Sequence, residues 1–559
     1  MLEDILNTTF FFIITILCFI TCFNYGYITN LIINSNENSD YKNSTIFIFV
    51  GFGILISLIS LINFFYKINY LIFIFLNISN IIFIIKIYSL RKSLIKFLLE
   101  NYKVFFLLLI ISKISMITYF ASDTGYYHLP LIKLITEQKT VFGLGNIFHQ
   151  FGFNNSNNFF SAFTMISPFF NRGFAIPSVL IFFCTILYLY NNRHKFNNYF
   201  YFLILLSSHF FYNFKNIGSA SPDFFVNCYA IIIFCEIFFL INNKNTFDIK
   251  LNIIKNLLLL LLSILILKFS TGFFVAMTGI FLIAFYKNYL IKTFTSKFLF
   301  IASFVLVTFF FKNIALTGYP FYPLGLFFIE TFWTVPSSLV TEIFNIVTLF
   351  AKKSGDPNFK IEGLNWIIYW IKSNDKIYIL SIIISFLLLF LNILAKQNEH
   401  GKINKKKKWF LFFYLSSLIF WFFTAPDLRF GLMLNVFIFL IVLDLNSIYK
   451  NKINNILNKF SKFIFIIVIF YSVIYLNVIN FYLNWNNNFY YKNGWRQINT
   501  KNKIISHKKI NNHNFIEMDG FCWYSEYFCR SSGSGINIED INVKKILFQN
   551  IVLFYNLKK

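Results

Sequence analysis

Asp123, in the motif SDTGYYHLP, is well placed to accept a proton. It follows closely after an apolar run that ends near residue 121, so we expect it at the boundary between a hydrophobic layer and water. Partial desolvation at such a boundary raises the pKa of a carboxyl group and makes its carboxylate a better base. Tyr127, His128 and His149 follow in the same segment and can bind a substrate through hydrogen bonds. The alternative is an interfacial loop with aromatic anchors and no chemistry.

Four further charged residues lie where other apolar runs begin or end: Asp223 (SASPDFF), Lys268 (before FSTG), and Asp427 and Arg429 (both in APDLRFG). Each also has a structural explanation, because Pro-Asp pairs are common at turns and helix starts and a terminal lysine can extend to the interface. Asp427 and Arg429 can simply pair with each other. A cation at headgroup depth can instead hold a lipid phosphate, which is the binding role predicted for Lys268. We expect Asp223, Lys268 and Arg429 to converge with Asp123 and His128 on one outer cavity.

The elements that must position these residues are membrane helices. The chain has 559 residues, of which 57% are hydrophobic and 13% charged, with a mean hydropathy of +0.64. This composition is too apolar for a soluble domain of this size. We count fourteen runs, give or take two, that are long enough to cross a bilayer. They lie near 8–30, 45–64, 69–86, 104–121, 174–190, 199–213, 224–241, 254–268, 272–287, 298–312, 377–394, 409–424, 429–445 and 462–480.

The distribution of lysine and arginine predicts the topology. The net charge of +26 comes largely from short basic clusters near 86–103, 193–195, 244–255, 287–297, 402–408 and 450–462. With fourteen crossings all of these clusters fall on one face, which the positive-inside rule makes cytoplasmic. This explanation is simpler than nucleic-acid binding, and no nucleic acid is predicted as a partner.

The same count places the N-terminus and three polar segments outside: 122–173, 313–376 and 481–559. The predicted fold is therefore an all-α polytopic membrane domain over residues 1–480 with outer loops at 122–173 and 313–376. The outer site would lie beneath the second of these loops. A small extracytoplasmic α/β tail follows over residues 481–559.

Signatures of soluble enzymes are missing from the sequence. It has no P-loop, GxSxG, HExxH or paired CxxC motif. No zinc site is predicted, because His128 and His149 lack carboxylate partners at ligand spacing, and the need for another divalent metal stays open. Five cysteines lie in apolar runs, whereas Cys522 and Cys529 would close a small disulfide loop if the tail lies in an oxidising compartment.

Several motifs resemble an uncharacterised bacterial family of multi-spanning proteins related to GT-C glycosyltransferases. They are SDTGYYHLP, GLGNIFHQFGFN, SPDFF, LTGYPFYP, APDLRFG and the CW of the tail, and the resemblance covers roughly residues 100 to 540. It implies a many-helix protein of the bacterial inner membrane with outer amphipathic helices and a C-terminal extracytoplasmic domain. By this resemblance Asp123 matches the catalytic base, which deprotonates an acceptor hydroxyl as it attacks the anomeric carbon of a polyprenyl-phosphate sugar.

The sequence departs from the pattern of that family in two respects. Asp123 is followed by Thr124 and Gly125 where the family commonly has a second acid, and several apolar runs precede the loop instead of one. To the residues of the family we add our own assignment of the phosphate-binding groups. These are Lys268, Arg429 and also Arg172, which would stabilise the departing phosphate electrostatically.

The leading hypothesis is a membrane glycosyltransferase acting on the extracytoplasmic face. Its donor substrate would be a polyprenyl-phosphate sugar, its acceptor a glycan or a lipid, its other partners membrane lipids, and no cofactor is predicted. A polysaccharide or lipid transporter is the first alternative. It would need ionisable residues in the middle of the membrane, whereas the acids and histidines singled out above lie at the ends of apolar runs or in outer loops. A glycan polymerase or ligase would be expected to use Arg and His in a late outer loop, and 313–376 contains neither.

Overall fold

The computed structural model describes most of the helical part of the chain and the strands of the tail. In the helical part it covers residues 2–34, 44–117, 123–167, 169–170, 172–192, 217–242, 246–353, 363–373, 379, 405–427 and 429–431. In the tail it covers residues 489–492, 495–498, 504–510, 513–519, 522, 528–531, 541–546 and 550–555.

Seven described helices are long and apolar enough to cross a membrane, which makes this a multi-pass membrane protein. They are α1 (Leu2–Ile33), α2 (Ile46–Phe65), α7 (Ile176–Asn191) with the preceding turn η4 (Gly173–Ala175), α10 (Pro222–Asn242), α11 (Phe247–Leu267), α12 (Gly272–Thr293) with η6 (Phe269–Thr271), and α13 (Ser296–Thr317). Helices suit these apolar segments because every backbone polar group is satisfied within the segment itself.

An eighth crossing is present if α3 (Tyr70–Lys86) and α4 (Tyr88–Ile117) are counted together as one bent span. The sequence predicted two separate crossings here, at 69–86 and 104–121, with a basic loop between them. Instead α4 begins directly after Ile87, at 102° to α3, and the predicted loop is helical.

The remaining predicted crossings fall on α17 or on residues that are not described. α17 (Lys405–Thr424) covers the predicted run 409–424 but opens with four lysines. The runs 199–213 and 462–480, and nearly all of 377–394 and 429–445, lie outside the described residues. The described part of the chain therefore contains fewer spans than the fourteen predicted.

Glycines bring the first two helices close together. A Cβ added at Gly26 of α1 would lie 1.8 Å from the carbonyl oxygen of Phe47, and one at Gly51 of α2 would lie 1.8 Å from that of Cys22. Close backbone packing of this kind stabilises helix pairs in a bilayer, where lipid tails are as apolar as the helices and provide no hydrophobic driving force.

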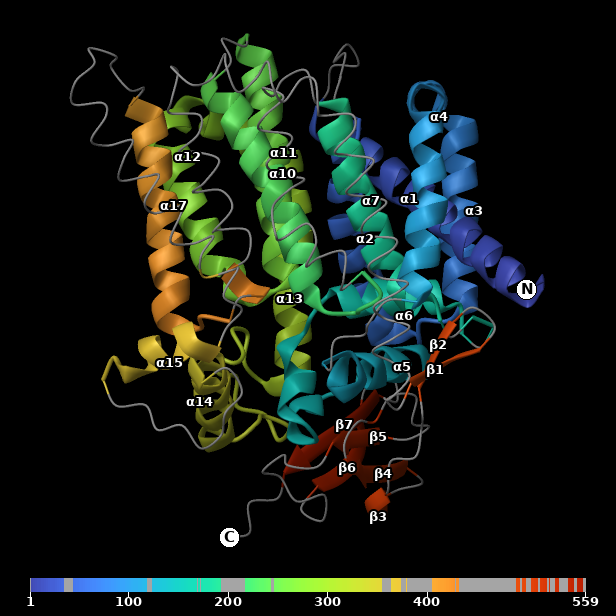
Figure 1. Cartoon of the computed structure of the whole chain (residues 1–559), viewed down its shortest axis with the longest axis vertical. Helices are drawn as coiled ribbons and strands as arrows, with labels where there is room; N and C mark the ends of the chain where they lie inside the picture. The colour runs from blue at the N-terminus through green and yellow to red at the C-terminus, as the bar shows by residue number, and fades with distance from the viewer. Residues whose placement is uncertain are drawn as a thin grey trace.

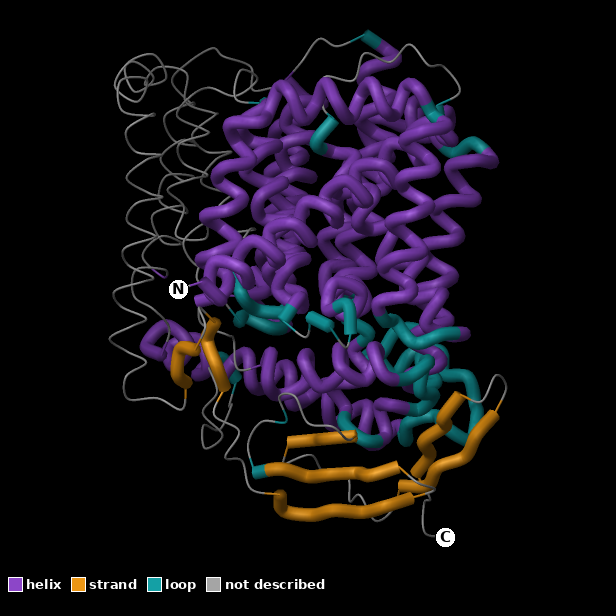
Figure 2. Tube along the Cα trace, turned by 90° about the vertical axis from the view of Figure 1, so that its right-hand side faces the viewer, coloured by secondary structure: helices purple, strands orange, loops and turns teal. Residues whose placement is uncertain are grey.

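The bundle has two different ends (Figures 1 and 2). At the lower end in Figure 1 lie the shorter helices α5 (Leu129–Glu137), α6 (Asn157–Met165), α14 (Ser337–Lys353) and α15 (Asn365–Ser373), with most strands of the tail beyond them. The opposite end is basic. There Lys292 Nζ lies 4.4 Å from the ring centre of Phe247, and Lys406 Nζ lies 4.4 Å from that of Tyr286. The predicted basic clusters at 287–297 and 402–408 thus share one end.

The described residues of the tail form three small sheets and no helix, in contrast to the predicted α/β tail. β1 (Phe489–Lys492) pairs with β2 (Trp495–Ile498), and β6 (Ile541–Ile546) pairs with β7 (Asn550–Tyr555), both antiparallel. In the third sheet β4 (His513–Met518) lies between antiparallel β3 (Ile504–Ile510) and parallel β5 (Phe528–Ser531). A disulfide joins Cys522 to Cys529 at the start of β5.

The tail is hydrogen-bonded to segment 122–173, which is the first of the two predicted outer loops. Phe142 N donates to Ile551 O and Leu553 N donates to Phe142 O, each over 2.8 Å, so that residue 142 continues the pairing of β7. The Asn146 side chain bridges the carbonyl oxygens of Trp333 and Leu553 at 2.8 and 3.2 Å. Both predicted outer loops and the tail therefore meet at the lower end of the bundle.

Candidate functional site

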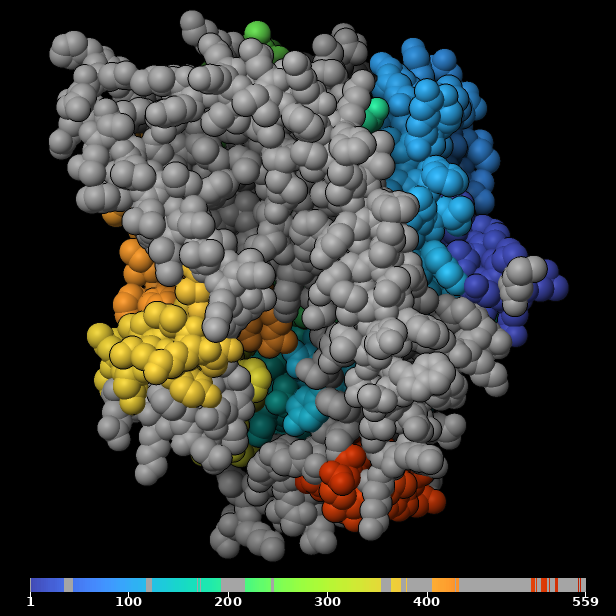
Figure 3. All heavy atoms as spheres, viewed as in Figure 1, coloured from blue at the N-terminus to red at the C-terminus, as the bar shows by residue number. Residues whose placement is uncertain are grey.

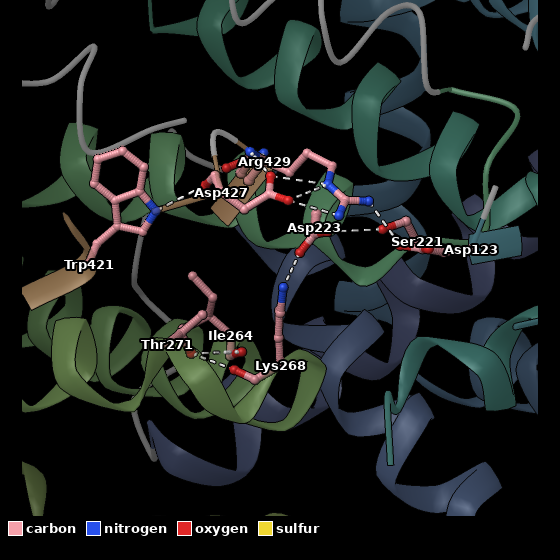
Figure 4. Close-up of polar contacts among 10 residues, drawn as sticks. Asp123, Ser221, Asp223, Ile264, Lys268, Thr271, Trp421, Asp427 and Arg429 are labelled. Atoms are coloured by element: carbon pink, nitrogen blue, oxygen red, sulfur yellow. Dashed lines mark hydrogen bonds and ion pairs between the residues drawn. The ribbon is translucent and has the colours of Figure 1, made fainter. Parts of the chain in front are cut away.

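Five charged side chains from four separate segments meet at this lower end (Figure 4). They are Asp123, Asp223, Lys268, Asp427 and Arg429, all of them predicted from the sequence as site residues. The predicted convergence of Asp123, Asp223, Lys268 and Arg429 is therefore found in the structure, and Asp427 joins them through its ion pair with Arg429. Three carboxylates face two cations, and each of these side chains keeps between 11% and 28% of its surface exposed.

Arg429 lies between two carboxylates. Its Nη1 donates to Asp123 Oδ2 at 2.9 Å, and its Nη2 donates to Asp427 Oδ2 at 2.9 Å. The Nε group adds contacts of 3.2 and 3.3 Å to the two Asp427 oxygens. Asp427 thus binds the guanidinium group through two of its nitrogens, which is the forked geometry in which arginine binds planar anions best. The third nitrogen, Nη1, donates to Asp123.

Lys268 and Asp223 form the second ion pair of the site, and both occupy the ends of helices. Asp223 lies in the first turn of α10 and Lys268 follows the last turn of α11, where the helix dipoles favour an anion and a cation respectively. Lys268 Nζ donates to Asp223 Oδ1 and lies 3.4 Å from the ring centre of Phe430. Ser221 Oγ donates to the other carboxylate oxygen at 3.2 Å.

A short turn after α17 positions Asp427 and Arg429. Pro426 cannot continue the helix, and Arg429 N donates to Asp427 Oδ1 at 2.9 Å, as aspartate commonly arranges in turns. Two tryptophans fix the same turn from outside it. Trp421 Nε1 donates to Asp427 O at 3.0 Å, and Trp370 Nε1, from α15 in the second outer loop, donates to Pro426 O at 2.6 Å.

Asp123 lies directly before η1 (Thr124–His128), a turn of π-helix, an element that occurs frequently at functional sites. Thr124 Oγ1 lies 2.8 Å from Ser219 Oγ, which connects this turn to the segment that leads into α10. Burial raises the pKa of the Asp123 carboxyl group. Arg429 opposes the shift, and the nearby carboxylates of Asp223 and Asp427 add to it.

Tyr127 and His128 lie behind the carboxylates. Burial is the main cause that raises the pKa of Tyr127, and the Asp123 and Asp223 carboxylates contribute. Burial lowers the pKa of His128 to about 3, with Asn158 beside the ring and Asp223, Lys268 and Arg429 in electrostatic range. His128 is therefore a neutral imidazole near the cluster over the physiological pH range.

The remaining predicted residues are placed elsewhere. His149 is buried in η3 (His149–Phe153), where its electrostatic neighbours are Glu342 and Arg530 and its carbonyl oxygen accepts from Tyr322. Arg172 precedes η4 at the start of α7. The disulfide of Cys522 and Cys529 belongs to the tail. Of the predicted binding residues, His149 thus lies apart from the five charged groups.

Sequence reasoning missed three kinds of contributor. Ser221 and Phe430 touch the second ion pair, and both stand within two residues of a predicted site residue, which was a usable signal. Thr124, counted above as a departure from the family pattern, links Asp123 to the neighbouring segment. Glu236 is fully buried within α10, where Tyr188 donates a hydrogen bond to it. This acid lies in the interior of an apolar run, away from the run ends at which the other candidate residues were found.

The site is suited to binding an anion and accepting a proton. Two cations can hold a phosphate or a carboxylate, and a carboxylate with a raised pKa lies within reach of one of them. Among the described residues no group of three or more His, Cys, Asp or Glu has the arrangement of a metal site. In Figure 3, atoms of the first outer loop (teal) and of the segment near residue 430 (orange) are visible inside a hollow beside α15 (yellow).

Comparison with known proteins gives one match. The model of a domain family of unknown function, DUF8201, matches residues 9–439, which include all five charged site residues. No curated protein and no solved structure matches the chain. Since the match extends over well more than half of the sequence, the chain belongs to the DUF8201 family.

Proposed function

We propose that this protein is a glycosyltransferase of the extracytoplasmic face that takes its sugar from a polyprenyl-phosphate donor. The observation that carries the proposal is the convergence of Asp123, Arg429 and Lys268 from distant parts of the chain at the non-basic end of the bundle. The basic opposite end supports a cytoplasmic location for that end and an outer location for the site. The same proposal places the protein in the bacterial inner membrane, with its N-terminus and its C-terminal tail on the extracytoplasmic side.

In the proposed reaction Asp123 is the general base. The acceptor hydroxyl oxygen forms a bond to the anomeric carbon, and its proton passes to the Asp123 carboxylate. The bond between the anomeric carbon and the phosphate oxygen breaks, and its electron pair stays on the phosphate of the departing lipid. Lys268 and Arg429 would stabilise the charge of that phosphate.

The contact between Arg429 and Asp123 defines the state of the site before the donor binds. A carboxylate that accepts from a guanidinium is a poorer base than a free one, because the contact favours its ionised form. A donor phosphate offers Arg429 a competing anion. When Arg429 turns to the phosphate, Asp123 loses this partner and its basicity rises, so the base becomes fully effective only with donor in place.

The test uses the full-length protein reconstituted in liposomes and a panel of polyprenyl-phosphate sugars. Asp123→Asn keeps the size of the side chain but cannot accept the proton, so turnover should fall by about 10²- to 10⁴-fold while donor binding persists. Glu137→Gln is the matched control, because it makes the same change in the same loop at an exposed residue whose carboxylate lies 3.8 Å from Lys133 Nζ. Equal turnover of wild type and Asp123→Asn, at equal amounts in the membrane, would contradict the proposal.

Glu236 favours the transporter as a second candidate. Ionisable residues buried within membrane spans often mark ion or substrate paths, and Glu236 is fully buried inside α10. Liposomes loaded with a lipid-linked glycan separate the two candidates. A transporter would move the glycan across the bilayer without consuming the donor, and Glu236→Gln would stop this movement while Asp123→Asn would not.

A further inference from the structure

The basic end of the bundle carries an exposed surface on α4 that the proposed reaction does not use. The first turns of α4 lie across the end of the bundle, seen almost end-on at the top of Figure 1, because the helix turns by 102° from α3. One face packs inward through Leu90, Leu94, Phe97 and Asn101, which are at most 5% exposed. This spacing is that of an amphipathic helix.

The opposite face of α4 combines basic and apolar side chains. It lines a shallow groove of about 490 Å³ formed by Tyr88, Arg91, Lys92, Ile95, Lys96, Leu99 and Glu100. The apolar members are unusually exposed, with 66% for Tyr88, 51% for Ile95 and 68% for Leu99. Such a mixture fits a helix at headgroup depth, where apolar side chains meet acyl chains and basic ones meet phosphates.

Among the residues that the structure describes, no carboxylate pairs with the positive charges of this groove. Arg91, Lys92 and Lys96 are exposed and take part in none of the ion pairs that the described residues form, and Arg91 lies 5.3 Å from the ring centre of Tyr88. Glu100 leaves a net charge of +2 over the groove. By contrast, Lys133, at the other end of the bundle, is paired with Glu137.

We infer that this face of α4, residues 88–103, is a binding site for the headgroup of an anionic phospholipid. Arg91, Lys92 and Lys96 would hold the phosphate, and Tyr88, Ile95 and Leu99 would contact the upper part of the acyl chains. The site lies at the end of the bundle away from Asp123, so it is independent of the proposed transfer reaction.

The probe is a photoactivatable phosphatidylglycerol in mixed micelles with the full-length protein. Cross-links should map to residues 88–103 and should be competed by unlabelled phosphatidylglycerol, but not by phosphatidylcholine or inorganic phosphate. Arg91→Gln, Lys92→Gln and Lys96→Gln together should weaken the association by roughly fivefold for each basic residue removed at low salt. Added salt should weaken it in the wild type as well.

The matched control removes three basic charges at the same end, by Lys287→Gln, Lys292→Gln and Lys297→Gln, and should leave the cross-linking unchanged. If both triple variants lose cross-linking equally, the association depends on the general surface charge and not on a site. If phosphatidylcholine competes as well as phosphatidylglycerol, the lipid contacts the helix without recognition of its headgroup. Either result overturns the inference. If the triple variant of α4 unfolds, Lys96→Gln alone should still lower the cross-linking several-fold.

Discussion

Asp123 and Arg429 stand 306 positions apart in the sequence and are joined by one hydrogen bond of 2.9 Å. Both residues could be identified from the sequence, because each lies at the end of an apolar run, where a charged side chain must be paired or bind a ligand. The sequence could not pair them, since Asp427, two positions away, was the nearer partner for Arg429. The structure shows that Arg429 contacts both acids, which follows from a guanidinium group that presents several donors in a fixed plane.

This geometry predicts the pH dependence of the reaction. The pKa of Asp123 is raised mainly by burial, so the activity of a base at this position should rise with pH over a range above that of an exposed aspartate, near 4. The positive charge and the hydrogen bond of Arg429 lower the pKa of Asp123. Arg429→Gln should therefore move the rising limb of the pH–rate profile to higher pH, besides weakening donor binding.

The measurement is turnover against pH for wild type and Arg429→Gln at donor concentrations well below saturation, where the profile reports the ionisation of Asp123 in the protein without donor. Glu137→Gln is again the control, and the rising limb of its pH–rate profile should coincide with that of the wild type. A limb that shifts to lower pH in Arg429→Gln, or does not move, would mean that Asp123 is not the group whose ionisation limits the rate.

At the scale of elements, the sequence predicted the position of most helices but not how the outer segments hold each other. The spans could be predicted from the apolar runs, because an apolar segment that crosses a bilayer must satisfy its backbone hydrogen bonds internally as a helix. The contact between Phe142 and β7 was not predictable, since it depends on backbone atoms of residues far apart in sequence. The three sheets of the tail were expected only as part of an α/β tail, because its polar composition obscures the alternation of its strands.

Gly143 offers a test of this contact. Its φ is +68°, and a Cβ there would lie 2.0 Å from Leu553 O, so Gly143→Ala should both strain the turn and push β7 away. Gly363→Ala is the control, because Gly363 also has a positive φ, of +57°, but nothing lies within 4 Å of the added Cβ. Limited proteolysis should release the tail faster from Gly143→Ala than from Gly363→Ala. Equal rates in the two variants would show that β7 does not depend on this contact.

At the scale of the whole molecule, the distribution of charge is the feature that the sequence predicted best. The basic clusters were placed on one face from the number of crossings, and those near 287–297 and 402–408 lie together at one end of the bundle. The number itself was less secure. The described helices provide seven or eight spans. Two of the predicted crossings are the bent pair α3 and α4, and four of the predicted runs fall wholly or mostly outside the described residues.

The orientation of the molecule in the membrane can be tested at its two ends. Glu330 is exposed in the second outer loop, and Asn288 is exposed near the basic end of α12. The native cysteines are buried or disulfide-bonded, so single cysteines at these positions should dominate the labelling. In intact cells a membrane-impermeant maleimide should label Glu330→Cys, and it should label Asn288→Cys only after the membrane is opened, because short loops rich in lysine and arginine stay in the cytoplasm. The reverse pattern would place Asp123 and Arg429 on the cytoplasmic side, where an outer-face transferase has no acceptor, and would leave the charge cluster to be explained by another reaction.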